Sequence, residues 1–152
     1  MTPKPISKRV LVDRLEMVGD LLREVRSLPL GDQDTFFADR RNLWTAESCL
    51  RRSLEALFDV GRHILARGFG QGVSEYKEIA IRLKERGVIE EKEASLLQVL
   101  AGYRNRLVHF YHEVTAEELY QLCTHRLGDL EVIQDAYRRW IKEHPEKIDS
   151  TL

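Results

Sequence analysis

The residues best suited to chemistry lie together between Ala101 and Val114, in the stretch AGYRNRLVHFYHEV. This stretch places the guanidinium of Arg104, the amide of Asn105 and the imidazole of His109 among apolar neighbours. An imidazole titrates close to pH 6.5, so it can accept or release a proton near neutrality. A guanidinium can hold a carboxylate or a phosphate through two parallel hydrogen bonds. These residue types can therefore supply acid–base catalysis and anion binding.

The spacing of these residues places two polar groups beside an apolar face. Leu97, Arg104 and Tyr111 are seven residues apart and share one face of a helix. Asn105 lies one turn before His109, whereas Arg104 and His109 stand roughly 140° apart around the axis. Their side chains converge if the arginine extends along the surface, if the helix ends near His109, or if a second copy supplies one of them. The alternative is that both are hydrogen-bonded packing residues.

The order of these residues resembles the Arg-x4-His-x-Tyr signature of the HEPN superfamily, and in particular of its HepT-like ribonuclease toxins. Arg104, His109 and Tyr111 occupy the positions of the signature. The resemblance continues in order from Leu43 to Tyr111 and includes the segments LFDVGRHILA, SEYKE and LKERGVI. One position departs from the pattern, because Phe110 stands where these proteins often carry a small residue.

The resemblance implies a metal-independent endoribonuclease toxin of a type VII-like toxin–antitoxin system, in which motifs from two chains of a homodimer line one cleft. Arg104 would hold the scissile phosphate and His109 would move a proton. Asn105 would orient the imidazole or bind phosphate. Tyr111 would receive AMP from a nucleotidyltransferase antitoxin, which silences the nuclease. The implied partners are RNA, a second copy and this antitoxin, and no cofactor or metal is expected.

Two other interpretations of the same stretch remain open. His109 and His112 are three residues apart and Glu113 follows, which suits a metal ion at a helix end, although no third histidine is near in sequence. In the second interpretation the chain is a non-catalytic helical partner of a nucleotidyltransferase and uses the motif surface for binding only. Sensitivity to EDTA would identify the first alternative, and an RNA cleavage assay would exclude the second.

The elements that position the motif are predicted to be helices, because apolar residues recur at spacings of three and four along most of the chain. We therefore predict an all-α fold, an antiparallel four-helix bundle with an additional short helix, HEPN-like, in a single domain over residues 1–152. The expected segments are a flexible arm over 1–6, helices over 7–28, 35–67, 74–86, 90–108 and 115–143, and a loose tail over 145–152.

Three features of the predicted long helix and its end matter for function. Its aromatic residues are expected to pack against neighbouring helices rather than to stack on a ligand, and most of its paired arginines are expected to form a solvated face. The glycines between Gly68 and Gly72 are interpreted as a helix stop, because no strand precedes them as a phosphate-binding loop would require. The aromatic residues are Phe36, Phe37, Trp44 and Phe58, and the arginines are Arg40, Arg41, Arg51 and Arg52.

Composition limits the function classes further. The chain has 152 residues and a formal net charge of -1, so any contact with nucleic acid must rest on a local group of arginines. Cys49 and Cys123 are expected to be buried free thiols in a reducing compartment. With no signal peptide and no apolar run long enough to cross a bilayer, we expect a soluble cytoplasmic protein.

Overall fold

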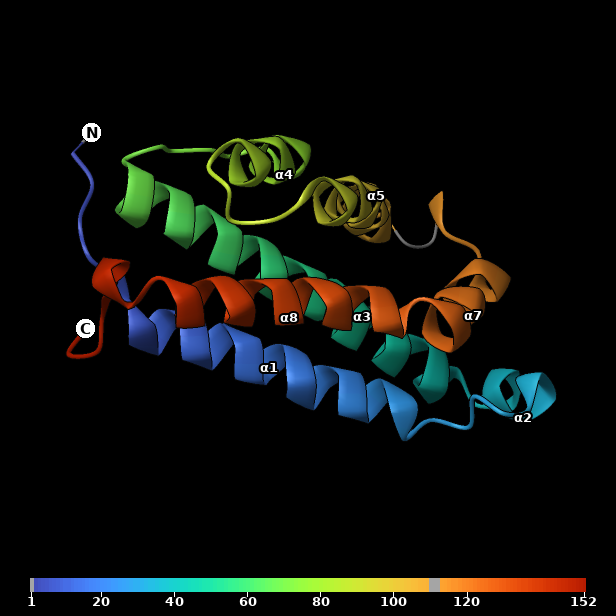
Figure 1. Ribbon diagram of the computed structural model, residues 1–152. Helices are drawn as coiled ribbons and strands as arrows, with labels where there is room; N and C mark the ends of the chain where they lie inside the picture. Colours follow the sequence, from blue (N-terminus) through green and yellow to red (C-terminus); the bar gives the residue numbers. More distant parts are fainter. Residues whose placement is uncertain (1, 110–112) are drawn as a thin grey trace.

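The computed structural model describes residues 2–109 and 113–152 and is built almost entirely from helices, which confirms the all-α prediction (Figure 1). The long helices are α1 (Lys8–Arg26), α3 (Arg40–His63), α5 (Glu91–Leu107) and α8 (Leu127–Glu143). The short helices are α2 (Gln33–Ala38), α4 (Tyr76–Glu85) and α7 (Ala116–His125). The remaining elements are the π-helical turn η1 (Ile64–Gly68), the 3-10 turn η2 (Pro145–Lys147) and the strands β1 (Ile6–Ser7) and β2 (Ile148–Asp149).

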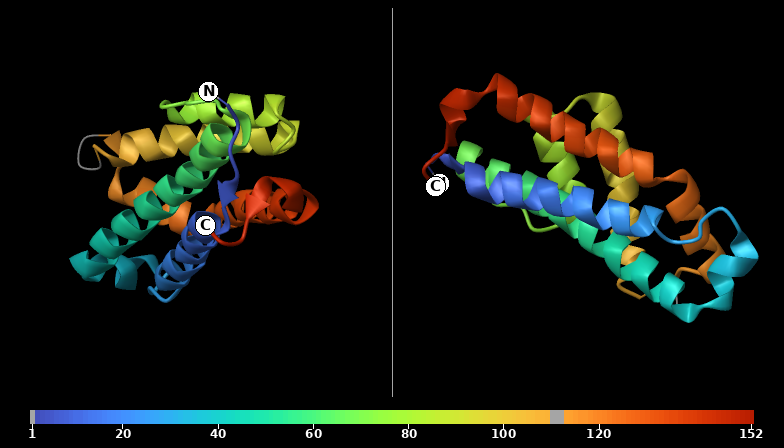
Figure 2. Two further views of the ribbon diagram at one scale, coloured as in Figure 1. Left: turned by 90° about the vertical axis from the view of Figure 1, so that its left-hand side faces the viewer. Right: turned by 90° about the horizontal axis from the view of Figure 1, so that it is seen from below.

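Helix α3 lies at the centre of the fold and contacts the other helices on several sides. Helix α1 packs along it through the predicted apolar face, and α8 covers the pair. Helices α4 and α5 run side by side across another side of α3 (Figure 2). The core residues that α1 contributes are Leu11, Leu15, Val18, Leu21, Leu22 and Val25. Across the described ranges, no helix is long and apolar enough to cross a membrane.

Two of the predicted helices are interrupted, so their expected boundaries are wrong. The helix expected over 35–67 breaks at Asp39, which has φ -123° and ψ 112° and whose carboxylate accepts a hydrogen bond from the Arg41 N–H at 2.9 Å. Asp39 thus caps a new helix instead of continuing the old one. The helix expected over 115–143 breaks at Arg126, where φ is -119°. Each break changes the direction of the chain and forms a separate short helix.

The end of the long helix agrees with the interpretation of the glycines as a stop. Helix α3 passes into η1, after which the Gln71 N–H donates to the Leu65 carbonyl at 2.9 Å. Gly70 has a φ of 62°, a conformation that glycine adopts without steric cost. The two cysteines also agree with expectation, because both are free and buried and burial raises the pKa of the Cys123 thiol to about 12.

The termini differ from the expected flexible arm and loose tail. Ile6 is fully buried and pairs with Ile148 in a short parallel ladder, so residues at opposite ends of the chain lie side by side. The Ser7 N–H donates to Nε2 of His63 at 3.0 Å, while the Ser7 hydroxyl accepts from the Val10 N–H and so caps α1. The arm is therefore docked on the end of α3. Hydrophobic burial and these hydrogen bonds outweigh the local disorder that two prolines suggest.

The His63 contact predicts a pH-dependent loss of stability. Burial, aided by the nearby charge of Arg67, lowers the pKa of His63 below its usual 6.5. Since Nε2 accepts the Ser7 N–H, the folded protein favours the neutral His63 ring. The stabilisation that this contact gives the folded state is present above about pH 6.5 and is lost as the pH falls through the lower folded-state pKa of His63. Urea unfolding at a series of pH values should therefore show the free energy of unfolding falling on acidification.

The variant His63→Gln removes the titrating ring, so this part of the pH dependence should disappear. The matched control is His125→Gln, which replaces an exposed histidine at the end of α7 and should keep the wild-type profile. Identical profiles for the wild type and His63→Gln would contradict the assignment.

Candidate active site

The motif residues lie where α5 ends. Arg104 and Asn105 belong to its last turn, and His109 follows in a turn in which its N–H donates to the Arg106 carbonyl at 3.0 Å and its carbonyl accepts from the Glu113 N–H at 2.9 Å. Asn105 and His109 are exposed, and Arg104 is partly buried. The helix therefore ends before the histidine, which is one of the conditions under which the arginine and the imidazole can approach each other.

Three helices fix the position of Arg104. Its Nη2 donates to Oε2 of Glu55 on α3 at 3.1 Å, and its Cζ lies 4.3 Å from the centroid of the Tyr76 ring on α4. The side chain is only 22% exposed, and its Nε is buried without a hydrogen-bond partner among the described residues. Arg104 is thus a positioned group with a partly accessible guanidinium. An acid and an aromatic face both stabilise its positive charge.

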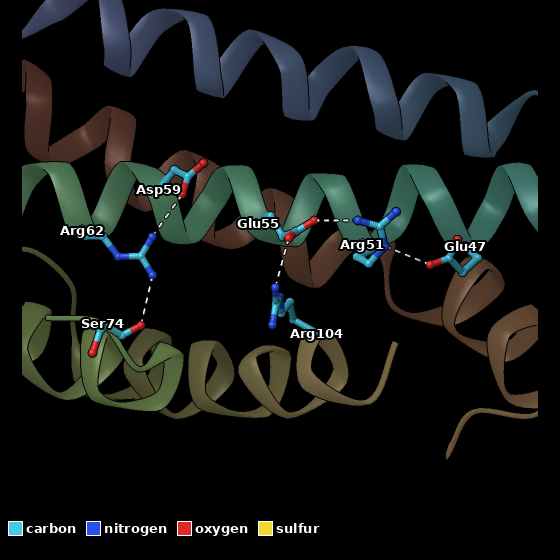
Figure 3. A network of polar contacts seen from close by, with 7 residues as sticks. All are labelled: Glu47, Arg51, Glu55, Asp59, Arg62, Ser74 and Arg104. Atoms are coloured by element: carbon cyan, nitrogen blue, oxygen red, sulfur yellow. Dashed lines mark hydrogen bonds and ion pairs between the residues drawn. The ribbon is translucent and has the colours of Figure 1, made fainter. Parts of the chain in front are cut away.

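Glu55 belongs to a row of alternating charges along α3 that faces the end of α5 (Figure 3). Arg51 donates through Nε to Glu47 at 3.0 Å and through Nη1 to Glu55 at 2.9 Å, so Glu55 binds two guanidinium groups. The hydrogen bond to Glu47 and the negative charges beside it raise the pKa of Arg51. Arg40, Arg41 and Arg52 are exposed, which confirms the expectation that most of these arginines form a solvated face, whereas Arg51 is partly buried and its charge is satisfied within the row.

Tyr76 connects this row to the start of α4. Its ring centroid lies 4.9 Å from that of Phe58 and 5.5 Å from the Cζ of Arg62, while Arg104 stacks on it at 4.3 Å. Nη2 of Arg62 also donates to the Ser74 carbonyl at 3.1 Å (Figure 3). The segment that leads into α4 is thereby held against α3, and Tyr76 presents its ring to the catalytic candidate.

A surface hollow of about 530 Å³ opens beside Arg104, between α3 and the end of α5. Two side chains at this hollow are unusually exposed for their type, Trp44 at 50% and Val108 at 47%. The prediction that the aromatic residues of this segment pack against other helices is confirmed for Phe36, Phe37 and Phe58 and is wrong for Trp44. The lining residues are Trp44, Glu47, Arg51, Glu55, Arg104, Leu107 and Val108.

Arg106, within the motif, binds the chain that follows it. Its two terminal nitrogens donate to the two carboxylate oxygens of Glu118 at 2.6 and 2.7 Å, and Nη2 also reaches the Glu113 carbonyl at 2.7 Å. The Glu118 N–H donates to the Thr115 hydroxyl at 3.1 Å, so the threonine caps α7. The Glu118 side chain binds Arg106 and so joins the end of α5 to the start of α7.

Several residues named from the sequence lie outside the described residues, namely Phe110, Tyr111 and His112. Neither the tyrosine nor the proposed metal pair can therefore be placed. Within the ranges that the structure describes, no group of three histidine, cysteine or acidic side chains is gathered as a metal site. Sequence reasoning gave no role to Glu55 or Tyr76. Their only local signals are the spacing of four from Arg51 to Glu55 and the place of Tyr76 in the SEYKE segment.

Comparison with known proteins gives one family and several similar folds. The family model described as "Ribonuclease HepT-like" matches residues 18–136. A tri-AMPylated Shewanella oneidensis HEPN toxin in complex with MNT antitoxin shares 20% identity at a TM-score of 0.76, over 86% of this chain and 97% of that one. A toxin–antitoxin structure with AMP-PNP shares 20% identity at a TM-score of 0.75, over 84% and 97%.

A third similar structure is the cytosolic protein of unknown function YutE from Bacillus subtilis. It shares 20% identity at a TM-score of 0.76, over 95% of this chain and 96% of that one. A search of curated proteins found no match. At these identities the solved structures establish the fold, and the family model establishes the membership.

Proposed function

Because the chain belongs to the HepT-like ribonuclease family, we propose that it is a metal-independent endoribonuclease that uses Arg104, Asn105 and His109. One observation carries the proposal. Arg104 is held by Glu55 and Tyr76 at the edge of a surface hollow, five residues before the exposed His109. A fixed cation and an accessible imidazole at one helix end are the two groups that RNA cleavage requires.

The reaction needs only the substrate's own nucleophile. The ribose 2′-oxygen forms a bond to the adjacent phosphorus, the bond from phosphorus to the 5′-oxygen breaks, and a cyclic phosphate and a free 5′-hydroxyl result. His109 takes the proton from the 2′-hydroxyl or gives one to the leaving 5′-oxygen, and water carries out the other proton transfer. Arg104 stabilises the negative charge that grows on the phosphoryl oxygens. Asn105 lies one turn from His109, so it can orient the ring or bind phosphate.

The contacts of Arg104 define how it would meet the phosphate. Its Nε is buried and its Nη2 already donates to Glu55, so the phosphate receives the remaining N–H groups of the two terminal nitrogens. The Tyr76 ring supports the guanidinium from its face and leaves its edge free for hydrogen bonds. A guanidinium that is fixed before the substrate arrives loses little entropy on binding, which lowers the cost of holding the phosphate in a reactive geometry.

A homodimer would complete the site. Within one chain the Arg104 guanidinium is engaged by Glu55 on α3 and by the Tyr76 ring on α4, whereas His109 lies beyond the end of α5. A second copy placed against the end of α5 would bring another arginine and another imidazole to the same groove. The exposed Val108 beside the motif supplies apolar surface for such a contact.

Replacement of the imidazole tests the catalytic role. The variant His109→Ala should lose about 10²- to 10⁴-fold in the rate of RNA cleavage, because that is the usual contribution of one acid–base residue. His109 is exposed, so the circular dichroism spectrum and the midpoint of urea unfolding should not change. The matched control His125→Ala should cleave like the wild type, and EDTA should leave cleavage intact. Wild-type protein that leaves RNA uncut would contradict the proposal and favour the binding-only partner.

Mixing two inactive variants tests the shared cleft. If one chain supplies Arg104 and its partner supplies His109, a mixed dimer of Arg104→Ala and His109→Ala subunits contains one intact site. Activity should therefore reappear when the two variants are unfolded and refolded together. If both residues act within one chain, every site in the mixture lacks a residue. A mixture that stays inactive despite exchanging subunits would exclude the shared arrangement.

Regulation would act on Tyr111. We propose that a nucleotidyltransferase antitoxin transfers AMP to it: the phenol oxygen attacks the α-phosphorus of ATP and pyrophosphate leaves. The similarity in fold between this chain and a tri-AMPylated HEPN toxin in complex with MNT antitoxin supports this proposal. The added phosphate carries negative charge, which would occupy Arg104 and repel the RNA backbone.

Mass spectrometry after co-expression with such a transferase should find AMP on Tyr111 and a parallel loss of RNA cleavage. The variant Tyr111→Phe lacks the acceptor oxygen and should stay unmodified and active in the presence of the transferase. Tyr103→Phe is the control and should be modified and silenced like the wild type. A Tyr111→Phe protein that the transferase still silences would contradict this assignment.

A further inference from the structure

We propose that Trp44 is a stacking platform for a base of the RNA substrate, within a few nucleotides of the scissile phosphate. The inference rests on the proposed ribonuclease activity and extends it to a residue that binds substrate. Trp44 is 50% exposed, the highest value among the large hydrophobic side chains of the described residues. It lies on the wall of the same hollow that contains Arg104.

The position of Trp44 on α3 connects it to the phosphate site. Trp44, Glu47, Arg51 and Glu55 are separated by three, four and four residues, so they form one row along the helix. From Trp44 to Glu55 the row is about 16 Å long at 1.5 Å per residue. Arg104 lies at the Glu55 end (Figure 3). A strand of RNA whose phosphate meets Arg104 therefore runs toward the indole as it follows the hollow.

The neighbours of Trp44 favour a base over a helix or a second copy as the occupant. A helical partner recognises apolar residues that repeat at spacings of three, four and seven. Around Trp44 these positions on α3 are polar or charged, so α3 itself presents no repeating apolar stripe there, and the exposed Val108 lines the hollow from the end of α5. A nucleobase fits this surface because it has an apolar face and polar edges. The neighbouring residues are Arg40, Arg41, Glu47, Ser48 and Arg51.

Because the charges in the hollow largely cancel, we assign the binding energy of a base at Trp44 to stacking. Its lining includes two arginines and two glutamates, and Arg51 is already bound by Glu47 and Glu55. These formal charges cancel, so the wall near Trp44 attracts phosphates weakly. Stacking on an aromatic ring needs no net charge and accepts any base. The contribution of Trp44 should therefore be nearly independent of salt, whereas that of Arg104 should weaken as salt increases.

Steady-state cleavage of a single-stranded RNA tests the proposal. Trp44→Ala should lower kcat/KM by about 5- to 150-fold through a higher KM, with kcat retained, because stacking on one aromatic ring contributes a factor of this size. Trp44→Phe keeps an aromatic face and should recover most of the loss. The control is Val132→Ala, which removes another exposed apolar side chain on α8, and it should match the wild type.

Fluorescence gives a readout that does not depend on turnover. The other tryptophan, Trp140, is only 3% exposed, so quenching by a non-cleavable 2′-deoxy oligonucleotide should report on Trp44. Quenching should occur in His109→Ala and be absent in Trp44→Phe. The slope of log affinity against log salt should be equal for the wild type and Trp44→Ala.

The outcomes separate this inference from the proposed function. Unchanged KM and kcat in Trp44→Ala, in a protein whose cleavage needs His109, would overturn the stacking role alone. A Trp44→Ala protein that sediments as a monomer while the wild type is a dimer would also overturn it, because Trp44 would then contact a second copy. Quenching without cleavage by the wild type would retain the stacking and reject the ribonuclease.

Discussion

The ion pair between Arg104 and Glu55 connects the last turn of α5 to the middle of α3, and the candidate site depends on it. A partly buried guanidinium without an acceptor is costly, because water no longer compensates its charge. Glu55 supplies that acceptor and Tyr76 supplies a negatively polarised ring face. The position of the motif arginine is therefore set by α3 and α4 as much as by the helix that carries it.

Helix α3 can position Arg104 because it packs into the core along one part of its surface and carries the charged row along another. One side is packed so closely that a Cβ on Gly61 would lie 2.7 Å from the Tyr137 hydroxyl and 2.9 Å from Leu83. Glycine at this position lets α8 and α4 approach the axis of α3. The other side carries the row from Glu47 to Glu55 that meets α5. Core packing thus fixes the position of α3 along its axis and its rotation about that axis, and with them the position of the charged row.

The same arrangement explains how a chain with a net charge of -1 can act on RNA in the proposed mechanism. The formal charges of Arg51 and Arg104 are matched by Glu47 and Glu55, and Arg104 would meet the phosphate through the N–H groups that Glu55 leaves free. Binding would then rely on local contacts, and one added phosphate on Tyr111 would be sufficient to remove the available cation. Cleavage and its silencing would act through a single electrostatic centre.

The sequence alone determined what depends on near neighbours: the all-α class, the glycine stop after α3 and the order of Arg104, Asn105, His109 and Tyr111 in the motif. Helical periodicity and capping arise within a few residues, so they can be predicted from local patterns. Only the tertiary structure decided that Arg104 pairs with Glu55, 49 residues away, that Ile6 pairs with Ile148, and that Trp44 stays exposed. These outcomes depend on where helices cross, and crossing is set by the packing of the whole core, which no local pattern contains.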